Sequence, residues 1–394
     1  MSSEKIQNLT NYFKNIVQND DETRTNFLKD YTIDQLEKLD IFKSSKKLYE
    51  RLKMVVNNEN LYEADQLYKT IHFRCMNNNL SDDGLSILFN GIIFFADKKS
   101  LQCAYDLAKA FLETLKKSSR AELDSKLRYQ IKCIHEYLGK CRSSNDEERT
   151  EFSVAVLKWS SSLFVKNKLD VNNELSVHLN YQSVFGHYDI HNDFAFNYWK
   201  ERNYVQARYH FLHSLDAKSF AFMIIQCHLN FGYPSEYDLF LAQGVFQFLT
   251  LRNLKSAEEL FHVYTENHPQ INKCKKFENF YESPLLNFMY FLIVTIKEKK
   301  YKEYKEILKA YKPFVEIDSS FQMYLEKIDE FFFDVKPVKK ESGGIFSNLM
   351  RMLTSNGMPS ESSTRAKSSR QQYVDSDEED SHSLGYLEDN ELLD

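Results

Sequence analysis

The sequence is poor in glycine and proline. Its 394 residues contain 10 Gly and 6 Pro, which is about a third of the usual share for this pair. β-Sandwiches, barrels and glycine-rich nucleotide-binding folds need many tight turns, so the composition disfavours them. No catalytic or cofactor-binding motif is found either: there is no Gly-x-Ser-x-Gly, no P-loop and no catalytic cysteine context. The sequence therefore predicts a helical scaffold that is not an enzyme and needs no cofactor.

Paired cysteines and long apolar runs are also lacking. The six cysteines are scattered without a Cys-x-x-Cys pair, which predicts free thiols in a reducing compartment. The longest apolar stretches, residues 240–251 and 284–296, fall short of the ~18 residues that a membrane span needs. The amino terminus has no apolar run behind a positive cluster. We therefore expect a cytosolic protein without a membrane span, with the nucleus as an alternative.

The charge is unevenly distributed. The net charge is −6, but the last twenty residues hold nine acidic residues and no Lys or Arg. Residues 41–140 hold 17 basic and 12 acidic residues, a net of +5. This mild excess could steer an acidic protein partner, whereas nucleic acid binding usually demands more.

What the sequence does contain is helical periodicity. Leu61, Ala64, Tyr68, Ile71 and Cys75 fall on one stripe of a helix, and comparable patterns recur along the chain. Typical helix lengths then predict about fourteen to seventeen helices joined by short loops. Ser81 and Ser283 are the kind of residue that caps a helix start, and Ser283 precedes a proline at the first helical position.

A weak internal repeat connects these helices. Four openings share a polar cap, an apolar residue and a later alanine: Asn60 to Ala64, Ser100 to Ala104, Asn203 to Ala207 and Asn253 to Ala257. A small residue at this position lets a neighbouring helix approach closely, as in stacked helix hairpins. The openings are 40, 103 and 50 residues apart, so we predict a degenerate tetratricopeptide-like α-solenoid and not a regular array. Chance recurrence of alanine, the best helix former, is the alternative.

The solenoid is expected over residues 41–354, and three segments are expected to stand apart from its stacked helices. Residues 1–40 should form one or two amphipathic helices, interrupted by the polar stretch Gln18–Thr25, that pack on the first hairpin. Residues 161–188 read as a loop, with a short helix possible at Leu175–Leu179. Residues 355–394 are too polar to fold and predict a disordered acidic tail. In that tail Ser376 precedes Asp-Glu-Glu-Asp, the context of an acidophilic kinase site or simply of a solubilising tail.

Histidines crowd one region. His187, His191, His210 and His213 lie close in sequence and Cys227 follows, so a zinc site is conceivable. No His-Glu-x-x-His or carboxylate-flanked pair accompanies them. We therefore expect partly buried, hydrogen-bonded histidines and no metal site.

One helix face carries candidate contact residues. On the helix that begins at Leu61, the side chains of Tyr62, Gln66, Lys69 and Phe73 fall opposite the apolar stripe, where aromatic residues favour a partner. Arg51 and Arg74 could extend this face with positive charge. Burial of the helix on two sides, and ordinary solvated arginines, are the alternatives.

Several runs resemble one family, the Golgi-to-ER-traffic protein four homologues. The runs lie in collinear order over roughly residues 45–354. They include Leu157-Lys-Trp-Ser-Ser161, Trp199-Lys-Glu-x-Asn-Tyr204, Arg208-Tyr-His-Phe-Leu-His-Ser214, Tyr264-Thr-x-x-His-Pro269 and Gly343-Gly344. The chain departs from the family in its amino-terminal extension, its longer 162–185 segment and its longer acidic tail.

The resemblance implies an α-solenoid that bridges two partners in the delivery of tail-anchored proteins. It implies that residues 41–160 face the targeting ATPase, with Tyr62, Tyr68 and Arg74 in or near that half as candidate contact residues. It implies that residues 190–354 hold a ubiquitin-like-domain protein or a chaperone-holding scaffold, with Phe246, Leu249, Phe288 and Phe332 in that half. The first three of these four could equally be core residues.

Two other classes remain open at this stage. A scaffold subunit of a proteasome-lid or initiation-factor complex would also be an α-solenoid, but it should end in a winged-helix module, for which the chain after Phe333 leaves no room. A metal-dependent hydrolase would need the histidines to converge on one site.

Overall fold

The structure is a computed structural model that describes residues 2–118, 120, 122–141, 146–165, 181–271 and 280–335. Within these ranges the regular structure is helical and no residue lies in a β-strand. The predicted all-α class is confirmed. The segment Leu175–Leu179 and the acidic tail from residue 355, including Ser376, lie outside the described residues.

In addition to residues 181–185, which are helical, seventeen α-helices and two short 3-10 helices have both ends within the described residues. They are α1 (Ser2–Lys29), η1 (Gln35–Lys38), α2 (Asp40–Lys43), α3 (Lys46–Asn57), α4 (Leu61–Asn77), α5 (Ser81–Asp97), α6 (Leu101–Lys117), α7 (Ser125–Lys140), α8 (Glu147–Val165), α10 (Tyr188–Lys200), α11 (Tyr204–Leu212), α12 (Ala217–Phe231), η2 (Pro234–Glu236), α13 (Tyr237–Thr250), α14 (Leu254–Asn267), α15 (Pro284–Lys297), α16 (Tyr301–Ala310), α17 (Lys312–Val315) and α18 (Ser319–Phe333).

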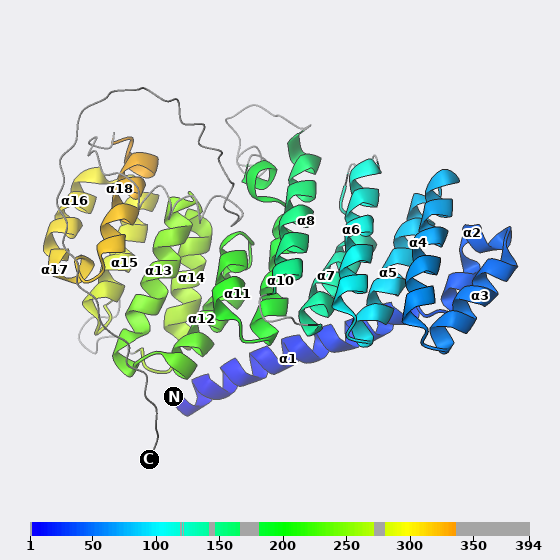
Figure 1. The fold of residues 1–394 in the computed structure, drawn as a ribbon. Coiled ribbons are helices and arrows are strands. Elements are labelled where there is room, and N and C mark those ends of the chain that lie inside the picture. Colours follow the sequence, from blue (N-terminus) through cyan, green and yellow to red (C-terminus); the bar gives the residue numbers. More distant parts are fainter. Residues whose placement is uncertain are drawn as a thin grey trace, which may run out of the picture.

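Neighbouring helices stack in one extended row. Figure 1 shows this row from α2 and α3 at one end to α16, α17 and α18 at the other. Within it α5 packs against α4 and α6, α10 packs against α7 and α11, and α13 packs against α14 and α18. This arrangement is the predicted α-solenoid, in which each helix pair buries its apolar faces against the next pair.

Six of the connections share one backbone conformation. Each has a single residue in the left-handed region, with φ between 55° and 60°: Glu59, Asn79, Lys99, Arg202, Arg252 and Lys299. The N–H of the following residue donates to a carbonyl five residues earlier at 2.9–3.2 Å. This Schellman closure usually employs glycine. The chain builds it from polar residues instead, which is one reason why so few glycines suffice.

The helix starts agree largely with the sequence. Asn60, Ser100, Asn203 and Asn253 are all N-cap residues, and the three asparagines accept a hydrogen bond from a backbone N–H in the first turn. The matching residues Ala64, Ala104, Ala207 and Ala257 are completely buried, as close helix approach requires. Ser283 caps α15 as predicted. Ser81 does not cap α5: it is the first helical residue and Leu80 occupies the cap position.

The predicted loop over residues 161–188 is wrong at both ends. Helix α8 continues to Val165, and residues 181–185 are helical as well. The hydroxyls of Ser161 and Ser162 donate to the carbonyls of Lys158 and Trp159 at 2.8 and 2.6 Å. These local bonds satisfy the serine side chains within the helix, so the serine-rich run does not end it.

The buried side chains form two hydrophobic cores that meet within α10. The first core extends from Tyr31 to Phe194. The second contains Ala195 to Ile328 together with Leu9 of α1. Helix α10 therefore contributes Phe194 to one core and Ala195 to the other.

Helix α1 corrects the prediction for the amino terminus. It is one helix of 28 residues, the first of the two arrangements predicted, but Gln18–Thr25 does not interrupt it and it does not pack on the first hairpin alone. Figure 1 shows it running along the row of helices, past both halves of the solenoid. The polar stretch stays helical because it contains neither Gly nor Pro, and because Asp20 and Arg24 within it find charged partners.

Candidate functional site

The outer face of α4 exposes the residues predicted to contact a partner. Tyr62 is 80% exposed and Phe73 is 63% exposed, and Gln66 and Lys69 are exposed between them. Ala64, Tyr68, Ile71 and Cys75 are fully buried on the opposite side. The helix is therefore buried on one side only. We call Tyr62, Gln66, Lys69 and Phe73 the α4 surface.

Two arginines, Arg51 and Arg74, flank the α4 surface. Arg51 of α3 donates to Glu63 of α4 at 2.8 Å and remains 60% exposed at its side chain. Arg74 lies in the last turn of α4 and is exposed. Lys69 forms an ion pair with Asp65 at 2.7 Å. Arg74 is therefore the more available of the two arginines for an acidic partner.

Tyr68 is not part of this surface. Its side chain is fully buried, and its hydroxyl donates to Oδ1 of Asn90 at 2.5 Å. A Cβ on Gly91 would lie 3.0 Å from its ring, so the glycine makes room for the tyrosine. Burial raises the pKa of Tyr68 far above its ordinary value. The expectation from family resemblance that Tyr68 contacts the ATPase is corrected: the residue holds α4 to α5.

The residues predicted in the carboxy-terminal half are mostly core. Phe246, Leu249 and Phe288 have no exposed surface. Phe246 meets Phe321 edge-on, with ring centroids 4.8 Å apart. Phe332 is partly buried and packs against the same core. The first three cannot touch a partner without unpacking, because α13 is apolar on nearly all sides and is consequently buried all round.

The carboxy-terminal half exposes other apolar side chains that sequence analysis missed. Val205 is 79%, Phe231 70% and Tyr233 74% exposed. The ring of Phe231 packs edge-on against Tyr204, with centroids 5.7 Å apart. We call Val205, Phe231 and Tyr233 the α11–α12 surface. The positions of these residues in the sequence could have indicated their exposure. Val205 lies off the buried stripe of α11, and the two aromatic residues flank Gly232 at the end of α12.

The histidine region is a hydrogen-bonded part of the interior. His191 Nδ1 lies 3.0 Å from His210 Nδ1, and His191 Nε2 lies 2.9 Å from the carbonyl of Phe185. His213 Nδ1 lies 2.6 Å from the Tyr181 hydroxyl. His187 caps α10 by accepting from the N–H of Asp189 at 3.1 Å. These four side chains therefore have protein partners, as expected for structural histidines.

Burial controls the protonation of these histidines. It lowers the pKa of His191 to about 4 and that of His210 well below its ordinary value. Cys227 lies on α12, where burial raises the pKa of its thiol. In the part of the chain that the structure describes, no group of three or more His, Cys, Asp or Glu residues is arranged to hold a metal ion.

A buried ion pair lies where the two cores meet, and the sequence did not reveal it. Arg149 of α8 is 1% exposed and donates to both carboxylate oxygens of Glu201 at 2.8 and 2.9 Å. Its guanidinium lies 4.2 Å from the ring centroid of Tyr198 and donates to His135 Nε2 at 3.2 Å. A bidentate pair of this kind fixes orientation as well as distance. It therefore joins α7, α8 and α10 in one arrangement.

A second charged network attaches α1 to the same region. Asp20 of α1 pairs with Lys200 of α10 at 2.7 Å and with Lys132 of α7. Arg24 of α1 pairs with Glu136 of α7, which also lies 3.3 Å from Lys200. Burial alone would raise the pKa of Asp20, but Lys132 and Lys200 bring it below its ordinary value. The network therefore favours the charged, docked form of α1.

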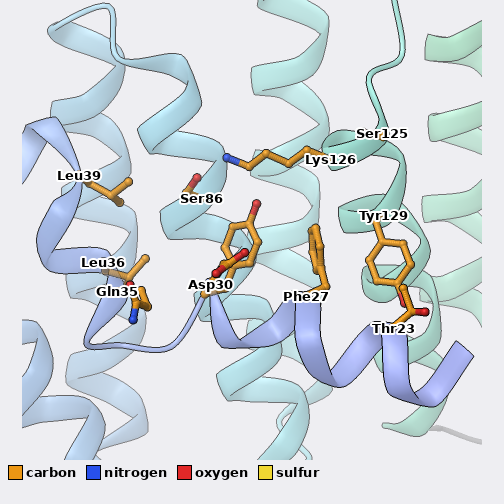
Figure 2. A pocket seen from close by; sticks show the side chains of 11 residues that line it. Thr23, Phe27, Asp30, Gln35, Leu36, Leu39, Ser86, Ser125, Lys126 and Tyr129 are labelled. Atoms are coloured by element: carbon orange, nitrogen blue, oxygen red, sulfur yellow. The ribbon is translucent and has the colours of Figure 1, made fainter. Parts of the chain in front are cut away.

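A cleft of about 510 Å³ lies where the end of α1 meets the solenoid. Figure 2 shows Phe27 of α1 and Tyr129 of α7 on its walls, with Leu36 and Leu39 from the next segment and Lys126 extending across it. The Lys126 Nζ lies 5.6 Å from the ring centroid of Tyr31. The cleft is therefore a feature of the amino-terminal extension and not of the α4 surface.

The described helices contain no candidate membrane span. None of them is both long enough and apolar enough to cross a bilayer.

Comparison with known proteins gives a consistent result. The sequence model of one family, Golgi to ER traffic protein 4, matches residues 78–354. The Golgi to ER traffic protein 4 homolog of Oryzias latipes is 33% identical over 308 residues, covering 78% of this chain and 87% of the relative. The homolog of Homo sapiens is 32% identical over 304 residues, covering 77% and 85%.

A solved structure agrees in fold. The crystal structure of C. therm. Get4 superposes with a TM-score of 0.60 at 17% sequence identity, covering 78% of this chain and 95% of that one. At this identity the likeness supports the helical architecture alone.

Proposed function

Since this chain belongs to the Golgi to ER traffic protein 4 family, we propose that it is a cytosolic adaptor that delivers tail-anchored membrane proteins to the ER. Its two halves bridge two partners. Residues 41–160 dock a targeting ATPase, and residues 190–354 hold a ubiquitin-like-domain protein or a chaperone-holding scaffold. The relatives are named as traffic proteins, which fits a chain that binds partners and performs no chemistry.

The observation that carries the proposal is the exposure of the α4 surface. Tyr62 and Phe73 lie on one face of a rigid helix whose other face is buried in the first core. Exposed aromatic side chains on a fixed scaffold are typical binding hot spots, because they bury much area and lose little entropy. Arg74 and the net charge of +5 over residues 41–140 favour an acidic partner at this surface.

For the second partner, the α11–α12 surface replaces the residues first expected. Phe246, Leu249 and Phe288 are buried, so we assign them to the core and Val205, Phe231 and Tyr233 to contact. The ubiquitin-like-domain or chaperone partner would cover these three exposed apolar side chains. Phe332 is only partly buried and remains a candidate at the end of α18.

The mechanism is geometric. A handover between two separately bound proteins becomes local when one rigid chain holds both, since the effective concentration is then set by the spacing of the two sites. The Arg149–Glu201 pair and the α1 network support that rigidity, because both join helices on either side of the boundary between the cores.

The first test targets the aromatic side chains. The double variant Tyr62→Ala, Phe73→Ala should weaken binding of the purified targeting ATPase by at least about tenfold, since truncating one hot-spot residue costs about 1–2 kcal/mol. Binding is measured by calorimetric titration, with circular dichroism as a check on folding. The matched control is Val205→Ala, which removes an equally exposed apolar side chain from the other half and should leave the affinity unchanged. An unaltered affinity of the double variant would remove the α4 surface from the site.

A charge-reversal variant tests the electrostatic part of the same proposal. Arg51→Glu combined with Arg74→Glu should weaken ATPase binding most at low salt, where surface charges are least screened. Lys309→Glu on α16, an exposed cation distant in sequence, should have little effect. Equal losses from both variants would indicate a general charge effect and not a docking site.

The two alternatives lose their support. The match to the traffic-protein family over residues 78–354 replaces the proteasome-lid or initiation-factor assignment. The histidines that a hydrolase would need for metal are hydrogen-bonded to the protein. Stoichiometric zinc in the purified chain would revive the metal hypothesis.

A further inference from the structure

The surface that α1 covers on the solenoid has apolar ends and a charged middle. Trp199 and Phe222 contact aromatic rings of α1 at one end, and Tyr129 contacts another at the other end. Between these contacts along α1, three charged side chains of α7 and α10 form ion pairs with the helix. We call these six residues the α1 seat: Tyr129, Lys132, Glu136, Trp199, Lys200 and Phe222.

The α1 side chains that meet the seat follow one helix face. Phe13, Asp20, Arg24 and Phe27 lie at positions i, i+7, i+11 and i+14 of α1. The two aromatic ends are therefore about 21 Å apart, or about four helical turns. The seat thus recognises a helix of at least this length that presents an aromatic ring, a carboxylate, a cation and a second aromatic ring in this order.

Helix α1 lies on the solenoid and is not packed into it. Among the side chains of α1 that the structure describes, Leu9 alone is buried, whereas α5 buries ten of its seventeen residues. The cleft of about 510 Å³ beside Phe27 and Leu36 is left open by the described residues (Figure 2). Removing α1 would therefore separate no two stacked helices of the row.

The charged middle of the seat favours exchange of one helix for another over permanent cover. Lys132 and Lys200 are only 12% and 14% exposed at their side chains beneath α1, and both pair with Asp20. Such shielded ion pairs add little stability compared with apolar contacts, but they select the register and the partner. All six seat residues lie within residues 78–354, which the family model matches, and α1 lies outside this match.

We propose that the α1 seat is a docking site for an amphipathic helix of a partner protein, with an aromatic side chain at each end and a carboxylate between them. Helix α1 occupies the seat until such a helix displaces it. It acts as an internal competitor, because the apparent affinity for the partner is reduced to the extent that the seat is closed. The seat shares no residue with the α4 surface or the α11–α12 surface, so the inference does not depend on the proposed adaptor function.

The probe for the test is an isotope-labelled synthetic peptide with the sequence of residues 2–29, added to the full chain. A saturating amount should displace the chain's own α1, so that amides of residues 3–17 in the chain exchange at least about tenfold faster by mass spectrometry. The same peptide with Asp20→Asn should bind at least about tenfold more weakly, because it lacks the carboxylate. The peptide with Glu22→Gln, which loses a charge at an exposed position, is the matched control and should bind unchanged.

A variant of the chain tests the competition directly. Asp20→Lys places a cation against Lys132 and Lys200 and should release α1 from its own seat. Fluorescence anisotropy should then show that the unmodified peptide binds this variant at least about tenfold more tightly than the unmodified chain. Glu22→Lys makes the same charge change at an exposed position and should leave the affinity unaltered.

Three results would overturn the proposal. If the peptide leaves the exchange of α1 in the unmodified chain unchanged, α1 is a permanent part of the fold. If the Asp20→Asn peptide binds as well as the original, the seat does not recognise a carboxylate. If light scattering of the Asp20→Lys variant shows a dimer that the peptide dissociates, the seat takes α1 of a second copy and not a partner's helix.

Discussion

Four histidine side chains, those of His135, His191, His210 and His268, are buried against neutral or cationic groups. His135 lies beside Arg149, His191 beside His210, and His268 beside His228. Burial lowers the pKa of His191 to about 4 and that of His268 to about 3, and it lowers the pKa of the other two well below the ordinary value. These side chains are therefore neutral in the folded protein throughout the physiological range.

This arrangement predicts loss of stability in mild acid. The unfolded chain takes up these protons near pH 6.5 and the folded chain only at much lower pH, so the free energy of unfolding should fall as pH decreases below about 6.5 and be nearly flat above it. Each such histidine can contribute at most about 1.4 kcal/mol per pH unit. Urea unfolding at pH 7.5, 6.0 and 5.0 measures this slope. Asp20 and Glu136, whose pKa values are lowered by their lysine neighbours against the effect of burial, stay ionised over this range.

Two variants identify the source of the slope. His210→Gln should reduce the loss between pH 6.5 and 5.0, whereas His262→Gln, at an exposed position of α14, should not change it. A slope that is identical in all three proteins would assign the acid sensitivity to other groups.

The sequence predicted correctly which side chains are buried where the pattern within a single helix is sufficient to decide it. The stripe Ala64, Tyr68, Ile71 and Cys75 was readable because helical periodicity alone determines which side is buried. The resemblance to the family placed Tyr68 among the contact residues, whereas the helical stripe placed it in the core. The structure agrees with the stripe, because Tyr68 is fully buried. Phe246 and Leu249 could not be placed in this way, because a helix that is apolar on all sides gives no preferred face.

At the scale of elements, the repeated left-handed connection determines how closely successive helices follow each other. Every one of the six left-handed residues is polar or charged and none is glycine. A residue with a Cβ pays about 1–2 kcal/mol for this conformation. Each of these connections therefore carries a small conformational strain that a substitution could relieve.

Replacing one of these residues by glycine should stabilise the protein. Lys299 has a φ of 55° and is exposed, so Lys299→Gly relieves the left-handed strain without removing a contact. Glycine also loses more entropy on folding, about 0.5–1 kcal/mol, and the net gain should be about 0.5–1 kcal/mol. Chemical denaturation measures it.

The control for this substitution should change the free energy of unfolding in the opposite direction. Glu306→Gly lies in the middle of α16, at an exposed helical position, and should destabilise by about 1 kcal/mol. If Lys299→Gly destabilised as much as Glu306→Gly, the connection would not be strained.

The course of α1 shows what local patterns cannot predict. Its amphipathic pattern predicted a helix, and the structure has one. Its docking depends on pairs such as Asp20 with Lys200, which are 180 residues apart in the sequence. Nothing within α1 itself specifies those partners, so the sequence located the helix but not the surface that it covers.

At the scale of the whole molecule, α1 joins the two hydrophobic cores. Near its start Tyr12 stacks on Phe222 and Phe13 packs on Trp199, with ring centroids 4.0 and 4.9 Å apart. Near its end Phe27 packs on Tyr129, with ring centroids 4.6 Å apart. The first two contacts belong to the second core and the last belongs to the first core. The helix therefore bridges the boundary at α10, and its Asp20 network adds to this bridge. Apart from α1, the cores are joined by the chain itself and by the Arg149–Glu201 pair.

Loosening the contacts of α1 with the second core should show how much α1 contributes to holding the two halves together. Phe13→Ala removes a ring from the second core but leaves Phe27 in place, so amides of residues 3–17 should exchange at least about tenfold faster while those of α4 to α6 keep their protection. Small-angle scattering should show a larger radius of gyration, because the angle between the two halves is then less restricted. Phe314→Ala on α17, a partly exposed phenylalanine of the second half, is the control and should alter neither result. Faster exchange in α1 without any change in scattering would mean that α10 and the Arg149–Glu201 pair hold the halves together unaided.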